Sequence, residues 1–204
     1  MKLQIRIYSL LIFSLFGAFP SFSQEADSIV KVLPEICLSE TEQLIFRNIN
    51  EYRVQHGLPT VALSKSLTYV AQLHVWDLAA NHPISQRCNL HSWSSKGAWK
   101  ACCYTEDHNG AVCMWNKPRE LTNYQGSGYE IAYWTNEPLS PSHFAEKALI
   151  GWKQSNEHDR VILNKGEWNK LDWISMGVGY LQGYAVVWFG TLPDEKQEIH
   201  LCVK

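Results

Sequence analysis

Three side chains that could act on a metal ion or a ligand lie far apart in the sequence. His91 lies within Asn-Leu-His-Ser-Trp, Glu130 lies at the start of an apolar segment, and His158 lies at the predicted end of a helix. Neutral imidazoles bind zinc or copper and leave coordination positions open for water. A carboxylate can orient such a histidine or act as a base toward metal-bound water. These residue types would suffice for metal-assisted hydrolysis, and equally for a polar cleft whose charge changes with pH.

The other candidate polar residues have simpler interpretations. His74 recurs on the apolar stripe of a predicted helix, which indicates a core histidine with satisfied hydrogen bonds. His108 lies in Asp-His-Asn-Gly, which is typical of a turn, and Glu106 and Asp107 indicate a solvated loop. No serine lies in a Gly-x-Ser-x-Gly motif and the cysteines are expected to be oxidised, so the sequence disfavours nucleophilic catalysis.

Six cysteines predict disulfide bonds, because an even number in an exported chain is typical of a disulfide framework. They are Cys37, Cys88, Cys102, Cys103, Cys113 and Cys202. A disulfide between the neighbours Cys102 and Cys103 would strain the peptide, so we expect each of them to bond to a cysteine elsewhere in the chain. Their partners would be Cys88 and Cys113, in an order that the sequence leaves open.

Cys37 and Cys202 would then join the two ends of the domain and close a long loop. The chain-entropy description gives such a loop about 5 kcal/mol of stabilisation at most. A zinc site is the alternative for the central cysteines, with Cys102, Cys103, His108 and Cys113 as its ligands.

Residues 1–23 have the pattern of a secretory signal peptide. Basic residues open the segment, residues 10–19 are apolar, and Ser23 is a small residue suited to cleavage. Cleavage there would leave residues 24–204. We therefore expect a secreted or periplasmic protein without a membrane span after cleavage, because no second segment is long and apolar enough.

The composition is that of one ordinary globular domain. The chain has 204 residues, of which 46% are hydrophobic and 19% are charged, and these values exclude collagen, coiled coil and bulk disorder. With 18 basic and 20 acidic side chains, the net charge is −2, so no nucleic-acid partner is expected.

Helices and strands that would position the candidate residues are predicted from periodicity. Apolar residues at helical spacing predict helices at about residues 40–56, 65–80 and 141–157. Ser39 and Glu42 form a capping box at the first of these. Runs rich in β-formers predict strands at residues 129–134, 173–181 and 184–189, and Gln182-Gly183 joins the last two as a hairpin. This order predicts an α+β domain with a small antiparallel sheet between helices.

Residues 81–127 show no sustained period, so we predict a long irregular loop stapled by disulfides. Trp93, Trp99, Tyr104 and Trp115 lie in this loop, near His91. They would either pack against the disulfides in place of a second core, or line an apolar or sugar-binding groove.

Several short segments occur along the chain in a characteristic order. They are Asn50-Glu51-Tyr52-Arg53, Ala71-Gln72-Leu73-His74, His91-Ser92, Gly128-Tyr129-Glu130-Ile131, Trp152-x-x-Ser155-x-x-His158, Met176-Gly177-Val178-Gly179 and Trp188-Phe189-Gly190. Their order and spacing resemble the CAP superfamily of cysteine-rich secretory proteins, antigen 5 and plant pathogenesis-related proteins. The likeness is to the bacterial branch of SCP-like domains and covers about residues 40–191.

The resemblance implies an α-β-α sandwich with a central cleft that holds two histidines and one or two acids. Matched by motif, His91 and His158 are the ligands for zinc or another divalent metal, and Glu130 is the acid and candidate catalytic residue. Glu130 is shifted relative to the Gly-Glu-Asn-Ile motif of the family. Ser155 also belongs to the implied cleft, at a position where animal and plant members carry a second Glu.

Three functions are compatible with these features. The first is a secreted, non-enzymatic binding module whose cleft holds a lipid, a sterol or a cell-envelope component, with or without a metal. The second is a metal-assisted hydrolase of peptide or envelope polymers, with His91 and His158 on the metal and Glu130 as the base. The third is a protein-interaction domain. Of the three, we expect the binding module.

Overall fold

The computed structural model describes residues 31–195 and 198–203. The predicted signal peptide, residues 1–23, lies outside the described residues. Within the described ranges, no helix combines the length and the apolar character needed to cross a membrane.

Three serine side chains start the three predicted helices. In α1 (Glu40–Gln55), Ser39 Oγ accepts from the Glu42 N–H and the Glu42 carboxylate accepts from the Ser39 N–H at 2.7 Å, which is the predicted capping box. Ser64 caps α2 (Lys65–Asn81), and Ser140 caps α5 (Pro141–Gln154). The predicted starts of all three helices are confirmed.

The helix that carries His158 differs from the prediction. α5 ends at Gln154, and Ser155 takes an extended conformation with ψ 111° before α6 (Asn156–Ile162) begins. Ser155 is the N-cap residue of α6, but its side chain makes no capping hydrogen bond, and its carbonyl oxygen accepts from the Asp159 N–H at 2.9 Å. His158 therefore lies in a separate short helix, followed by the 3₁₀ turn η1 (Gly166–Trp168).

Four strands form the central sheet, in the order β2-β4-β5-β3. β3 (Gly128–Trp134), β4 (Ser175–Leu181) and β5 (Tyr184–Gly190) pair antiparallel and confirm the predicted strands. Gln182 and Gly183 both have positive φ, as a two-residue hairpin turn requires. β2 (Ala62–Leu63) adds a parallel edge to β4, so the sheet is mixed rather than purely antiparallel.

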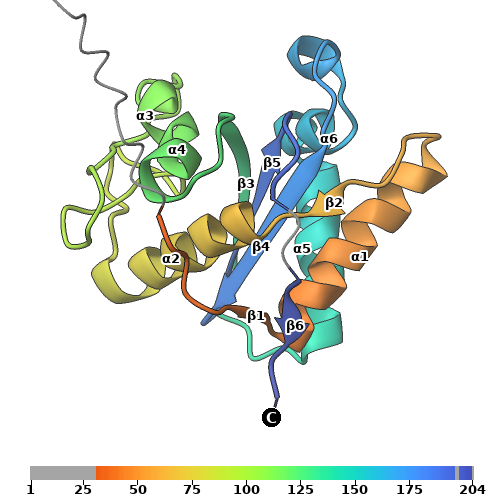
Figure 1. The fold of residues 1–204 in the computed structure, drawn as a ribbon, viewed down its shortest axis with the longest axis horizontal. Helices are drawn as coiled ribbons and strands as arrows, with labels where there is room; N and C mark the ends of the chain where they lie inside the picture. Colours follow the sequence, from red (N-terminus) through yellow and green to blue (C-terminus); the bar gives the residue numbers. More distant parts are fainter. Residues whose placement is uncertain (1–30, 196–197, 204) are drawn as a thin grey trace, which may run out of the picture.

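Helices cover both faces of this sheet and make the expected α-β-α sandwich. Figure 1 shows the strands between α2 on one side and α1 with α5 on the other. Because side chains alternate along a strand, β5 contributes Val187 to the core under α1 and α5, and Val186 and Trp188 to the core under α2.

Close packing of α2 on β4 explains the two glycines of the Met-Gly-Val-Gly segment. A Cβ on Gly177 would lie 2.1 Å from the carbonyl carbon of Leu67, and one on Gly179 would lie 2.4 Å from that of Ala71. Only glycine lets the helix backbone come this near to the strand. This packing brings α2 within reach of residues on the sheet.

The region predicted to be irregular contains two short helices and two disulfides. α3 (Ala111–Trp115) and α4 (Lys117–Leu121) are only five residues each, too short to show a period. The bridges are Cys88–Cys103 and Cys102–Cys113, which settles the order left open by the sequence. They also contradict the alternative zinc site, because these sulfurs are bonded to each other.

The two ends of the domain are joined as predicted. Cys37 and Cys202 form a disulfide, and β1 (Cys37–Leu38) pairs in parallel with β6 (His200–Leu201). In Figure 1, β1 and β6 lie at one end of the sheet, while α3 and α6 lie at the other.

Candidate functional site

Glu130 accepts hydrogen bonds from two histidines that come from different parts of the chain. Its Oε2 lies 2.5 Å from Nδ1 of His74 in α2, and its Oε1 lies 2.7 Å from Nδ1 of His91 in the long loop. The Glu130 side chain has no exposed area. β3 thus places a buried carboxylate between α2 and the loop.

His74 is held by hydrogen bonds on both sides of its ring. Its second nitrogen, Nε2, lies 3.0 Å from the carbonyl oxygen of Ser92, so both ring nitrogens face acceptors. Only the protonated ring donates from both nitrogens. His74 and Glu130 therefore form a buried pair, which is ionic when the His74 ring is protonated. The sequence predicted a satisfied core histidine, which is confirmed, but missed its bond to Glu130.

The pKa of the Glu130 carboxyl lies below its usual range. Burial alone would raise this pKa, but the charge and hydrogen bond of His74 and the hydrogen bond and charge of His91 together lower it by more. Glu130 is therefore ionised, and it fixes His91 with the proton on Nδ1. The lone pair of a neutral His91 ring is then on Nε2.

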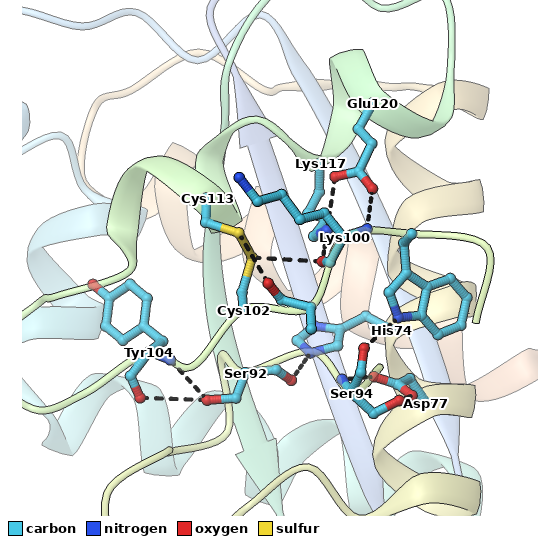
Figure 2. The surroundings of a disulfide bond; sticks show 12 residues. His74, Asp77, Ser92, Ser94, Lys100, Cys102, Tyr104, Cys113, Lys117 and Glu120 are labelled. Carbon is cyan, nitrogen blue, oxygen red and sulfur yellow. Dashed lines mark hydrogen bonds and ion pairs between the residues drawn. A yellow bond between two sulfur atoms is a disulfide. The ribbon is translucent and has the colours of Figure 1, made fainter. Parts of the chain in front are cut away.

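Hydrogen bonds to α2 and to the disulfide loop hold the segment around His91. Ser92 contributes its carbonyl to His74 and its Oγ to the Tyr104 N–H at 2.9 Å, and Figure 2 shows it between these two residues. Asp77 of α2 accepts from the Ser94 N–H at 2.7 Å. The conformation of the loop is therefore set by elements on both of its sides.

Trp93 links this network to a buried lysine. The His74 ring stacks on Trp93 at 4.3 Å between centroids with planes 6° apart, and Lys117 Nζ lies 5.2 Å from the Trp93 centroid. Burial lowers the pKa of Lys117, while its hydrogen bond to Glu120 opposes this shift. Lys117 and Glu120 lie 2.7 Å apart (Figure 2). Trp93 therefore packs within the core, as one of the two sequence interpretations expected.

His158 faces His91 across a cavity. The two ring centroids are 6.3 Å apart. Burial lowers the pKa of His158 to about 4, helped by His91 and opposed by Glu130. His158 is therefore neutral at neutral pH and keeps a lone pair available.

The cavity between them has a volume of about 680 Å³. Its lining includes all three residues singled out from the sequence, His91, Glu130 and His158. Ser155 is not among the lining residues and instead sits at the junction of α5 and α6. The structure thus brings together residues that are far apart in the chain.

Further cavity residues were given simpler interpretations from the sequence. His108 does occupy a turn, with φ 63°, but its Nδ1 lies 2.8 Å from Tyr104 Oη and its side chain lines the cavity. Glu106 and Glu157 also line it. Burial raises the pKa of Tyr104, and the negative charges of Glu130 and Glu157 raise it further. The cavity is therefore more acidic than the three predicted residues alone imply.

A divalent metal would find two imidazoles here. In the described part of the chain, no group of three or more His, Cys, Asp or Glu side chains is arranged to hold a metal ion. His91 and His158 remain as a two-nitrogen donor set, and Glu130 lies behind His91 as its hydrogen-bond partner. Such a set leaves coordination positions for water or ligand.

Comparison with known proteins gives a family and a fold. A model of the cysteine-rich secretory protein family (CAP) matches residues 46–182. A search of curated proteins finds no significant match.

Two solved bacterial structures are similar in fold. An outer surface protein of Borrelia burgdorferi has a TM-score of 0.50 and 17% identity, over 74% of this chain and 92% of that one. An extracellular SCP-domain protein of Bacillus anthracis has a TM-score of 0.51 and 20% identity, over 74% of this chain and 40% of that one. At these identities, the similarity supports the α-β-α fold and leaves the ligand undefined.

Proposed function

Because the chain belongs to the cysteine-rich secretory protein (CAP) family, we propose that it is a secreted or periplasmic binding module. Its cleft would hold a divalent metal ion on His91 and His158, together with a small apolar or cell-envelope ligand such as a lipid or a sterol. The location is supported by the bacterial relatives, one described as an outer surface protein and the other as extracellular. The facing pair of imidazoles on one cavity is the observation that carries the proposal.

The protonation states of the two rings suit metal binding. Glu130 holds the proton of His91 on Nδ1 and so leaves Nε2 as the donor atom. His158 is already neutral, so a metal would not have to displace a proton from it. When bound, the ion would supply Lewis-acid polarisation of a ligand oxygen.

The surroundings of Glu130 favour a binding role over hydrolysis. A metal-assisted hydrolase would need a base near the cavity, and Glu130 is the sequence candidate. Both of its oxygens already accept from imidazoles, and the side chain is buried. These contacts favour Glu130 as the residue that orients His91. Hydrolase and protein-interaction functions are the alternatives that the experiments below distinguish.

Zinc titration of chelator-treated protein tests the proposal. Calorimetry should give one ion per chain, and His91→Ala and His158→Ala should each weaken binding by more than the ~10–100-fold typical of an outer-shell change. His143→Ala is the matched control, because His143 is an exposed residue of α5. Near-ultraviolet circular dichroism, which reports the packed tryptophans, checks that each variant is folded. Zinc binding that is absent, or equal in all four proteins, would contradict the metal site.

Two further measurements separate the three functions. A lipid that co-purifies with the secreted chain and is lost with the His91→Ala substitution would support the binding module. Zinc-dependent cleavage of peptide or envelope polymers that is lost in both histidine variants would support the hydrolase instead. A protein partner retained by the double His91→Ala/His158→Ala variant would support the interaction domain.

A further inference from the structure

A second, smaller cavity opens beside the histidine cleft and is lined mainly by aromatic side chains. Its volume is about 280 Å³. Met114 and Trp115 of α3 and Tyr129 of β3 line only this cavity. The other lining residues are shared with the cleft: Tyr104, His108, Glu130, Val161, Glu167 and Trp168. The two cavities therefore form one recess with a polar end and an aromatic end.

Three aromatic rings that line the smaller cavity are inclined to one another. The Trp115 ring lies 5.4 Å from the Tyr129 ring at 55°, and the Trp168 ring lies 5.2 Å from it at 69°. Trp115, Tyr129 and Trp168 are each only partly buried, although together they pack against the core. Ring faces carry partial negative charge and attract cations, and several faces around one cavity are the known arrangement for quaternary ammonium groups.

The charged residues of the recess also favour a cationic ligand. Its lining includes three exposed carboxylates, those of Glu106, Glu157 and Glu167, while the Glu130 carboxylate is buried and already bonded to two imidazoles. Arg160 is the single lysine or arginine in the lining, and it pairs with Glu167. An anionic ligand would meet net repulsion here, whereas a cationic ligand would gain from both the carboxylates and the rings.

The α3 wall of the cavity is fixed in place before any ligand arrives. The Cys102–Cys113 disulfide ties α3 to the loop, one residue before Met114. Gly110, at the start of α3, has φ 87°, and a Cβ there would lie 2.3 Å from the Cys103 carbonyl oxygen. A wall that is already ordered costs little conformational entropy on binding.

We propose that this aromatic side pocket binds a methylated ammonium group, so that the cleft accepts an organic cation of the choline type. The proposal rests on the proposed function in that the pocket opens into the same cleft, and it names a chemical class for the ligand. Binding in the aromatic pocket needs no metal, so this proposal and the proposed metal site can be refuted independently.

Calorimetric titration with choline and with its neutral isostere 3,3-dimethyl-1-butanol tests the charge preference. On chelator-treated full-length protein, choline should bind at least about fivefold more tightly than the isostere, as expected for a cation held against ring faces. The choline methyl proton signals should shift upfield on binding, because ring currents act on groups placed over aromatic faces. Equal binding of both compounds would overturn the proposal in favour of a merely apolar pocket.

Substitution of one ring tests the location. Trp168→Leu should weaken choline binding about tenfold, while Trp168→Phe, which keeps a ring, should lose less. Trp134→Leu is the matched control, because Trp134 is 47% exposed at the far end of β3 and outside the recess. Choline binding that is unchanged in folded Trp168→Leu would overturn the proposal.

Two additional arms complete the experiment. Trp115→Leu, which changes a ring that lines only the smaller cavity, should weaken choline binding and leave the zinc titration as in the wild type, which separates the pocket from the metal site. Vesicles of phosphatidylcholine, compared with free choline, distinguish a lipid headgroup from a free solute as the source of the cation. Trp168-dependent binding of either one supports the pocket, and binding of neither overturns it.

Discussion

Glu130 illustrates how one buried charge organises a site. Its two oxygens accept from His74 of α2 and from His91 of the disulfide loop. A buried carboxylate is costly unless it is paired and hydrogen-bonded, and here both conditions are met by imidazoles. The same bonds leave one nitrogen of His91 for a ligand. The pair with His74 thus supports the fold, while the bond to His91 prepares the cleft.

His158 should make the metal-free protein less stable in mild acid. Its pKa is about 4 in the folded chain and near 6.5 when unfolded, so the unfolded state binds more protons between these values. Unfolding free energy should therefore fall as pH drops from 6.5 toward 4. Glu130, whose pKa is lowered, loses its contribution only below the usual carboxyl range. Urea unfolding of chelator-treated protein at pH 7 and 4.5 measures the fall.

Substitution of His158 isolates its share of this pH dependence. His158→Gln should reduce the difference between the two pH values by about 2 kcal/mol, after a discount for partial exposure. His143→Gln, on an exposed site of α5, should leave the difference unchanged. Equal pH dependence in wild type and His158→Gln would show that the folded-state pKa of His158 is not depressed.

Among the helices and strands, the contact between α2 and β4 fixes the position of His74 beside the sheet. α2 carries His74, and its backbone lies against Gly177 and Gly179. A larger residue at either glycine would push the helix away from the sheet. Since His74 reaches Glu130 across this contact, the separation of the two elements also governs the site.

Gly179→Ala should destabilise the protein by about 1–3 kcal/mol, the usual cost of overpacking a core. Its new Cβ would lie 2.4 Å from the backbone of Ala71, so helix or strand must shift. Chemical denaturation followed by tryptophan fluorescence measures the change. Gly57→Ala is the comparison, since Gly57 has φ 75° but no atom near its would-be Cβ. A smaller loss for Gly179→Ala than for Gly57→Ala would contradict the packing argument.

The long elements were predictable because their signals are local. Serine caps and apolar spacing located α1, α2 and α5, and β-rich runs located β3, β4 and β5. The two-residue β2 and the five-residue α3 and α4 are too short for a periodic pattern, and tertiary packing and disulfides stabilise them instead. The break at Ser155 was missed because the residues after it can also be helical.

The site was predictable only in part. His91, Glu130 and His158 were identified through resemblance to a family, since their spacing alone does not imply proximity. The position of His74 does indicate a buried partner, because a histidine on an otherwise apolar helix stripe needs a hydrogen-bond acceptor or donor inside the core. Which carboxylate supplies that partner depends on the packing of α2 on the sheet, and sequence periodicity does not contain that information.

In the whole molecule, one end of the sheet carries the cleft and the other end carries the disulfide that joins the two ends of the domain. Figure 1 shows α3 and α6 at one end, and the β1–β6 pair at the other. The cleft uses the first end, while the Cys37–Cys202 disulfide closes the second across 165 positions of the chain. Stability gained from this closure is therefore expected to be independent of ligand binding.

The double substitution Cys37→Ala/Cys202→Ala should lower the free energy of unfolding by about 2–5 kcal/mol, because a long loop loses much entropy when it is closed in the unfolded chain. Zinc affinity, measured on the folded variant, should stay within about twofold of the wild type, since sites without shared contacts act independently. The comparison is Cys102→Ala/Cys113→Ala, which removes the tie on α3 and should weaken binding of choline as well as stability. The loss in the free energy of zinc binding could instead be as large as the loss in the free energy of unfolding. The two ends would then be coupled through the sheet, which would contradict the independence of the cleft from the Cys37–Cys202 disulfide.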